Sequence, residues 1–128
     1  DLKTYRDFAE QVKNTKRLLL KFLIDAKQAG KTVAGYGAPA KGNTLLNYCG
    51  IRSDFLDYTV DLSPHKQGKF LPGIHIPVFN PDKVRETRPD YLLILPWNLR
   101  DEIISQMAHI REWGGKFVLP IPEVRVVQ

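Results

Sequence analysis

The stretch TVAGYGAPAKGN, residues 32–43, is the most informative part of this chain. Residues 32–36 have the composition of a buried strand, and the apolar run that begins at Leu45 fits the inner face of a helix. A glycine-rich turn, residues 37–42, lies between them. The order strand, glycine turn, helix is typical of an anion site, because the first amides of a helix lack intrahelical partners and lie at the positive end of its dipole.

The spacing of Gly35, Gly37 and Ala40 also meets the G-x-G-x-x-G/A pattern of nucleotide-binding folds. Glycine permits a tight turn and close approach of a ligand to the backbone, so Gly37 and Ala38 are candidate contacts. Lys41 adds a cation beside the same amides. The alternative is that this is only a turn at the end of a buried strand, and the pattern alone does not decide between the two.

Composition indicates one globular domain. The 128 residues are 43% hydrophobic and 26% charged, which is ordinary for a chain with a packed core. No apolar run approaches the ~20 residues of a membrane span, and the charged start DLKTYRDF does not resemble a secretory signal. We therefore expect a soluble, cytoplasmic protein without a membrane partner.

Metal chemistry is not expected from the sequence. A single cysteine, Cys49, excludes an internal disulfide and a cysteine-rich zinc site, and its apolar surroundings predict a small core residue. The three histidines lack the spacing of metal ligands; they are His65, His75 and His109.

The net charge of +5 raises the question of nucleic acid. Five basic residues fall on one early helical segment, where we expect a solvated face: Lys13, Lys16, Arg17, Lys21 and Lys27. A pocket for a negatively charged small ligand accounts for Lys41, Lys66 and Lys69 at least as well. We therefore expect no nucleic acid partner.

The first thirty residues predict one long helix. Apolar residues recur at helical spacing over residues 2–29, and Gly30 supplies a left-handed stop. Such a helix is longer than a small domain needs for its own packing. We expect residues 1–30 to be a connector from a preceding domain, residues 31–128 to be the ligand-binding domain, and the chain to be a fragment of a larger protein.

The remaining segments predict an α/β fold. Expected strands cover residues 31–36, 57–61, 74–79, 91–95 and 116–119, and expected helices cover residues 40–48, 80–87 and 99–113, with Asn80 and Asn98 as helix caps. The tail adds an extended stretch at residues 124–127. Strands alternating with helices favour a Rossmann-like, mostly parallel five-stranded sheet in the order 3-2-1-4-5, with helices on both faces.

In that strand order, ligands bind where the order reverses, outside the carboxyl ends of the first and fourth strands. Three loops should meet there: residues 37–42, 61–69 and 96–98. We infer one cleft from these three loops.

Five further residues of these loops have candidate roles. Asp61 ends the second strand, where dinucleotide folds place an acid on the ribose; alternatively it caps the turn that follows. Lys66 and Gln67 could clamp a phosphate. Trp97 offers a stacking surface, although it could equally belong to the core. Asn98 offers a polar contact, although helix capping is the favoured role for it.

No catalytic residue is assigned. The sequence has no nucleophile motif and no carboxylate pair, and Tyr36 and His65 are the only acid/base candidates near the predicted cleft. The residues alone thus indicate a module that binds a nucleotide or phosphate ester. A dinucleotide- or CoA-binding domain of an oxidoreductase or ligase remains open, as does a non-catalytic interaction domain that uses the first helix.

Three ordered motifs carry a family resemblance: GYGAPAKGNTLLNYCGI at residues 35–51, DLSPHKQGKFLPGIHIPV at 61–78, and LPWN at 95–98. Together they resemble the C-terminal domain of the S-adenosylmethionine-dependent C-methyltransferases that act on nucleotide-linked deoxysugars. The resemblance implies a Rossmann-like domain that helps bind the nucleotide part of the sugar substrate. It also implies that a separate domain holds S-adenosylmethionine and supplies the acid/base residues.

Carried over to this sequence, the resemblance makes five residues candidates for lining the substrate cleft: Gly37, Lys41, Lys66, Gln67 and Trp97. The family's N-terminal cysteine zinc motif and methyl-donor domain have no counterpart in these 128 residues. The resemblance therefore implies that the isolated chain is inactive and does not bind S-adenosylmethionine. Its expected partners are a nucleotide-linked sugar and the missing domains of the same chain.

Overall fold

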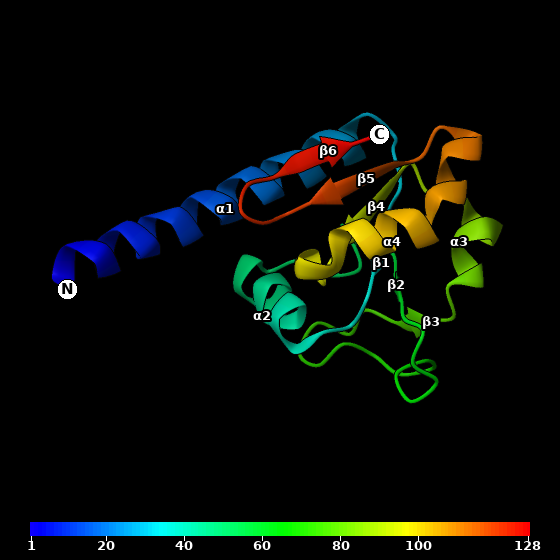
Figure 1. The fold of residues 1–128 in the computed structure, drawn as a ribbon, viewed down its shortest axis with the longest axis horizontal. Coiled ribbons are helices and arrows are strands. Elements are labelled where there is room, and N and C mark those ends of the chain that lie inside the picture. Colours follow the sequence, from blue (N-terminus) through cyan, green and yellow to red (C-terminus); the bar gives the residue numbers. More distant parts are fainter.

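The computed structural model describes residues 1–128 and contains one six-stranded sheet flanked by helices (Figure 1). In chain order the elements are α1 (Leu2–Gln28), β1 (Val33–Tyr36), α2 (Ala40–Cys49), β2 (Thr59–Val60), β3 (Val78–Phe79), α3 (Asp82–Thr87), β4 (Tyr91–Ile94), the 3-10 helix η1 (Trp97–Leu99), α4 (Arg100–Gln106), the 3-10 helix η2 (Ala108–Trp113), β5 (Lys116–Leu119) and β6 (Arg125–Val127).

The sheet has the strand order β3-β2-β1-β4-β5-β6. β1 lies between β2 and β4, and its Gly35 pairs with Thr59 on one side and Leu93 on the other. All pairs are parallel except β5 with β6. The predicted α/β fold and the order 3-2-1-4-5 are confirmed. The count of five strands is corrected to six, because the extended tail returns along β5 after a short loop and pairs with it antiparallel.

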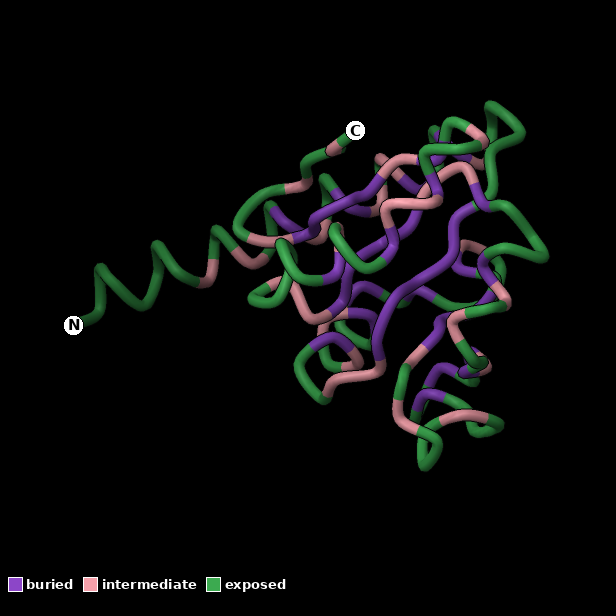
Figure 2. The backbone as a smooth tube through the Cα atoms, turned by 45° about the vertical axis from the view of Figure 1, so that its right-hand side comes forward, coloured by how far each residue is buried: buried purple, intermediate pink, exposed green.

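Alternating strand residues divide the core between the two faces of the sheet. Val33 and Leu93 point to the face covered by α1 and α2, whereas Ala34 and Leu92 point to the face covered by α3 and α4. Because both faces are covered, the central strands β1 and β4 carry no charged residue, and the buried backbone in Figure 2 follows the middle of the sheet. The expectation of helices on both faces is met.

Only the second half of α1 belongs to this core. Leu19, Leu23 and Ala26 are buried, whereas Tyr5 is 70% and Phe8 64% exposed. No residue from 2 to 14 is buried, and this segment, which we call the arm, projects away from the sheet (Figures 1 and 2). No helix is long and apolar enough to cross a membrane.

The single helix predicted over residues 99–113 is wrong. The chain winds as a 3-10 turn from Trp97, runs as α4 to Gln106, and returns to 3-10 winding in η2. Asn98 therefore lies inside a turn, closed by a 2.9 Å hydrogen bond from the Leu99 N–H to the Pro96 carbonyl, and does not cap α4. Tighter winding at helix ends is common because it satisfies terminal groups.

Candidate functional site

A hollow of about 340 Å³ lies beyond the carboxyl ends of β1, β2 and β4, and we call it the switch-point cleft. All three loops predicted to meet contribute to it. Its lining residues are Tyr36, Ala38, Pro39, Asp61, Leu62, Lys66, Pro96, Leu99, Glu102, Ile103 and Gln106.

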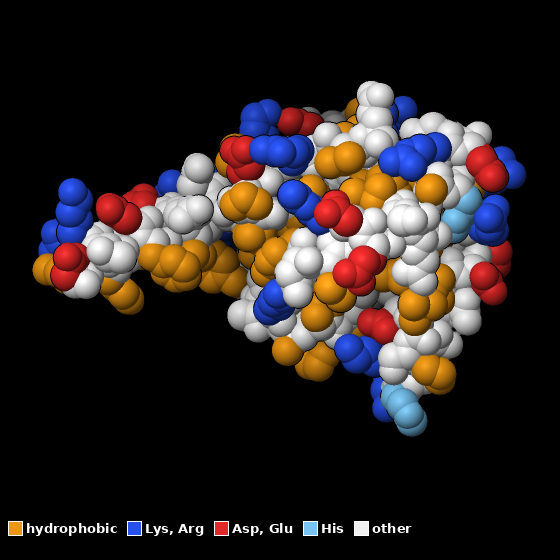
Figure 3. Space-filling view, viewed as in Figure 1, with side chains coloured by type: hydrophobic (Ala, Val, Ile, Leu, Met, Phe, Trp, Pro, Cys, Tyr) orange, Lys and Arg blue, Asp and Glu red, His pale blue; other side chains and the backbone are white.

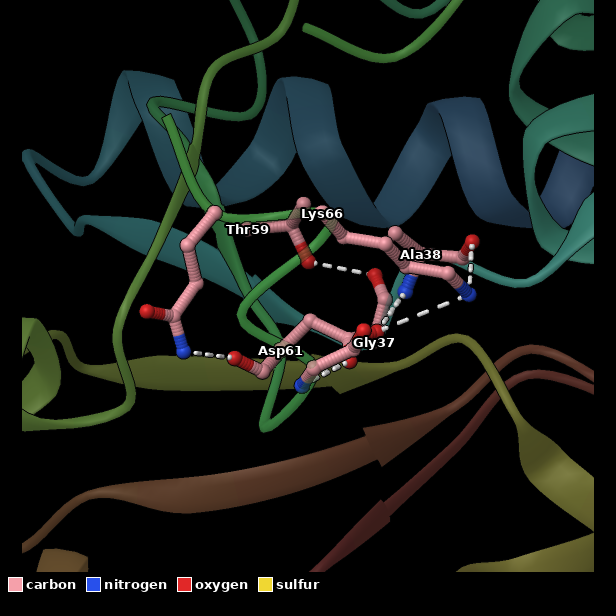
Figure 4. Close-up of polar contacts among 7 residues, drawn as sticks. Gly37, Ala38, Thr59, Asp61 and Lys66 are labelled. Carbon is pink, nitrogen blue, oxygen red and sulfur yellow. Dashed lines mark hydrogen bonds and ion pairs between the residues drawn. The ribbon is translucent and has the colours of Figure 1, made fainter. Parts of the chain in front are cut away.

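Asp61 holds two loops of the cleft together (Figure 4). Its Oδ2 accepts a 2.9 Å hydrogen bond from the Ala38 N–H, and its Oδ1 accepts one of 2.9 Å from the Ser63 N–H. Lys66 Nζ lies 4.0 Å from Oδ2, and the Asp61 side chain is only 17% exposed. These are the contacts of the turn-capping role, and they use both carboxylate oxygens within the chain.

Lys66 and Gln67 fold back onto the same turn. Lys66 Nζ donates to the Ala38 carbonyl at 3.1 Å, and Gln67 Nε2 donates to the Asp61 carbonyl at 2.8 Å. Lys66 lines the switch-point cleft with nearly half of its side chain exposed, whereas Gln67 mainly fastens the loop. The structure thus brings the lysine, more than the amide, to the cleft.

The glycines of the turn are required by packing. Gly37 has a φ of +96°, and a Cβ there would lie 2.6 Å from Pro96 Cδ. A Cβ on Gly42 would lie 2.9 Å from Leu95 Cβ. Gly42 therefore allows α2 to pack closely against the residue that follows β4. Gly37 itself is buried, and its carbonyl accepts a 2.7 Å hydrogen bond from Thr59 Oγ1. Gly37 therefore determines the shape of the turn while it is itself buried.

The start of α2 carries unpaired donors. The N–H groups of Ala40, Lys41 and Gly42 have no acceptor within the chain, and the first turn contains no acid. Lys41 stands in that turn, where a cation is unfavourable against the helix dipole. Its Nζ lies 5.1 Å above the Trp97 ring. An anion placed here would satisfy the amides and offset the charge of Lys41.

Trp97 and Asn98 do not line the switch-point cleft. Because η1 begins immediately after Pro96, Trp97 turns toward α1 and lines a second hollow of about 290 Å³, which we call the arm groove. The arm groove is lined by Phe8, Gln11, Val12, Thr15, Leu45, Trp97, Ile121 and Pro122. Asn98 is exposed and lines neither hollow. The expectation that Trp97 and Asn98 join the predicted cleft is corrected by this winding.

Glu102 and Gln106 line the switch-point cleft and were missed by sequence reasoning. Tyr36 Oη donates a 2.8 Å hydrogen bond to Gln106 Oε1. Burial, and then the negative charge of Asp61, raise the pKa of Tyr36, so its hydroxyl remains protonated near neutral pH. A spacing of four residues on one helix could have revealed that Glu102 and Gln106 share a face.

The other acid/base candidate, His65, lies outside the switch-point cleft. It lines a neighbouring hollow of about 370 Å³ together with Lys66, Lys69 and Phe70. Lys66 borders both hollows, so the basic loop after β2 separates them.

Comparison with known families identifies a match over almost the whole chain. Residues 1–122 match the family described as the C-methyltransferase C-terminal domain. The C-methyltransferase NovU of Streptomyces niveus is 42% identical over 123 residues, which is 96% of this chain. The chain spans only 29% of the length of that relative.

Comparison with solved structures gives the fold alone. UDP-D-quinovosamine 4-dehydrogenase from Vibrio fischeri superposes with a TM-score of 0.55, covering 77% of this chain and 93% of that one. The two sequences are 18% identical, so the likeness supports a Rossmann-type architecture and carries no inference about activity.

Proposed function

The chain belongs to the C-methyltransferase C-terminal domain family, and from this premise we propose that it binds the nucleotide-linked sugar substrate of an S-adenosylmethionine-dependent C-methyltransferase. In this proposal the chain is one domain of a longer cytoplasmic enzyme. Another domain holds S-adenosylmethionine and supplies the acid/base groups. The isolated chain is then inactive, with residues 1–30 leading into the binding domain at residues 31–128.

The start of α2 is the observation that carries the proposal. Three N–H groups without acceptors, an absence of acids and a lysine in the first turn favour a multiply charged anion. A diphosphate fits this chemistry because its oxygens can accept several hydrogen bonds at once. Lys41 and Lys66 supply cations beside this turn: Lys41 Nζ lies above the Trp97 ring, and Lys66 Nζ donates to the Ala38 carbonyl.

The switch-point cleft would then receive a neutral part of the substrate. Tyr36, Gln106 and Glu102 give it donors and acceptors suited to hydroxyl groups. We assign no catalytic role to these residues, because the methyl donor and the acid/base groups belong to another domain in this proposal.

The residues at the end of the second strand do not fit the ribose of a dinucleotide. Such cofactors use a free acid at the end of the second strand to bind the ribose. Here the Asp61 carboxylate is occupied by the Ala38 and Ser63 amides and lies near Lys66. The dinucleotide-binding alternative therefore has less support than a diphosphate site at α2.

Isothermal titration calorimetry tests the proposal on the isolated chain. We expect weak binding of thymidine or uridine diphosphate and of their sugar esters, and no heat with S-adenosylmethionine. Binding of S-adenosylmethionine without any nucleoside diphosphate binding would overturn it.

A further inference from the structure

The arm presents an apolar face that nothing in the chain covers. Leu2 and Phe8 are each 64% exposed and Tyr5 is 70% exposed, and the three residues follow one another at helical spacing. Hydrophobic side chains gather along the lower side of the projecting helix (Figure 3). Solvated monomers rarely leave a contiguous apolar patch with two aromatic rings unpartnered, so this face is suited to contact with protein.

The apolar face continues into the arm groove. Phe8 and Val12 border the groove from α1, and Leu45, Trp97 and Ile121 border it from the body of the domain. The two surfaces therefore form one apolar strip that runs from the tip of the arm into the groove beside Leu45 and Trp97. A partner that fills it must contact both the arm and the domain.

The arm also needs a partner for its own stability. An isolated helix of this length is marginal in water, and the arm, although it continues into the packed half of α1, buries none of its own residues. The Asp1 side chain accepts a 2.9 Å hydrogen bond from the Thr4 N–H and so satisfies one donor of the first turn. A helical segment with an uncovered apolar face gains packing energy from a surface outside these residues.

The polar side of the arm argues against a lipid surface. Asp7 and Glu10 lie there among Lys3, Arg6 and Lys13, and Glu10 pairs with Lys13 at 3.5 Å. Helices that lie on membranes carry mainly Lys and Arg on the polar side. Mixed charge around an aromatic strip is instead typical of contact with another folded protein surface.

We propose that the arm face and the arm groove dock the methyl-donor-binding part of the longer methyltransferase chain. The family match includes α1. The match covers 29% of the 42% identical relative, so the other 71% of that relative lies outside it. A domain tethered to this one covers the strip at high effective concentration. The inference rests on the longer chain in the proposed function, but not on sugar binding.

Hydrogen exchange on two forms of the protein tests the docking. We compare the 128-residue chain with the longer protein expressed from its natural coding sequence. Residues 2–12 should gain about tenfold or more protection in the longer protein. Equal exchange in both forms, or a coding sequence without a further domain, would overturn the proposal. Protection that rises with concentration in the 128-residue chain would assign the strip to a second copy instead.

A charge placed on the strip of the longer protein is the second measurement. Phe8→Asp should abolish the added protection of residues 2–12 and separate the melting of the two domains. Asn14→Asp adds the same charge at an exposed position away from Phe8 and should do neither.

Thymidine diphosphate binding, measured by calorimetry, should be unchanged in Phe8→Asp. This readout separates failure of the docking surface from failure of the nucleotide site. Unchanged melting with Phe8→Asp would overturn the docking.

Discussion

The backbone N–H of Ala38 donates a 2.9 Å hydrogen bond to the Asp61 carboxylate across 23 residues of sequence. This bond fastens the glycine turn after β1 to the loop after β2. It also places a negative charge beside the turn that the strand–turn–helix pattern marked as an anion site. An incoming diphosphate is therefore expected at the next amides, at the start of α2, away from Asp61.

Replacing Asp61 tests this fastening. Asp61→Ala removes the acceptor of two backbone amides and should lower the free energy of unfolding by about 1.5 to 3 kcal/mol. Asp61→Asn keeps one acceptor oxygen and should cost less. Urea unfolding of both variants measures the difference. Equal stability of wild type and Asp61→Ala would show that solvent replaces the carboxylate without loss.

Lys41→Ala tests the diphosphate site. Loss of one charge-assisted contact should weaken nucleoside diphosphate binding by about 1.5 to 3 kcal/mol, or roughly one to two powers of ten in Kd. Stability should change by less than about 0.5 kcal/mol, because Lys41 is an exposed side chain. Lys21→Ala on α1 is the matched control, since Lys21 pairs only with Asp25 at the surface. Unchanged affinity with an intact fold would make the glycine stretch a structural turn.

Two glycines with left-handed backbone angles separate strain from collision. Gly30 has a φ of +73° and open space where a Cβ would lie, so Gly30→Ala should cost about 1 to 2 kcal/mol for its left-handed backbone alone. Gly37→Ala adds a methyl group against Pro96 and should cost about 1 to 3 kcal/mol more. Thermal and urea unfolding measure both. Similar losses for the two variants would mean that Pro96 moves aside freely.

His109 makes stability depend on pH. Its Nε2 is buried without a hydrogen-bond partner, and burial, followed by the positive charge of Arg85, lowers its pKa below the ordinary 6.5. As pH falls through about 6.5, the unfolded chain binds a proton that the folded chain does not, so stability falls until the folded pKa is reached. His109→Gln should flatten this slope in urea titrations from about pH 7 to about pH 5. An unchanged slope would assign it to other groups.

Much of the fold could be predicted because local pattern and tertiary structure agree. The strand at Tyr91–Ile94 is apolar throughout because both faces are covered, and Gly30 follows α1 with the left-handed φ of a helix stop. The break at Met107 could not be predicted, because Ile103, Met107 and Ile110 keep helical spacing while the winding tightens beyond α4. Periodicity locates the buried face and is insensitive to that change.

The candidate site was predicted less completely, because its geometry depends on contacts between distant segments. The meeting of the loops at Ala38, Asp61 and Pro96 follows from strand order alone. The direction of Trp97 depends on the 3-10 turn and on where α1 lies, and neither is encoded in the LPWN motif. The occupation of Asp61 by backbone amides could be proposed only as one of two roles.

The antiparallel strand β6 has a protective consequence for the whole molecule. It pairs with β5 from Phe117 to Leu119, and Arg111 Nη2 donates a 3.0 Å hydrogen bond to the Gln128 carbonyl beyond it. The family match ends at residue 122, before this strand begins. In a chain truncated at residue 122, the backbone N–H and C=O groups of β5 would be unpaired. Such an exposed edge can pair with strands of other molecules and cause aggregation. With residues 125–127 in place, the edge of β5 is paired, and the edge of the sheet is instead a strand of three residues.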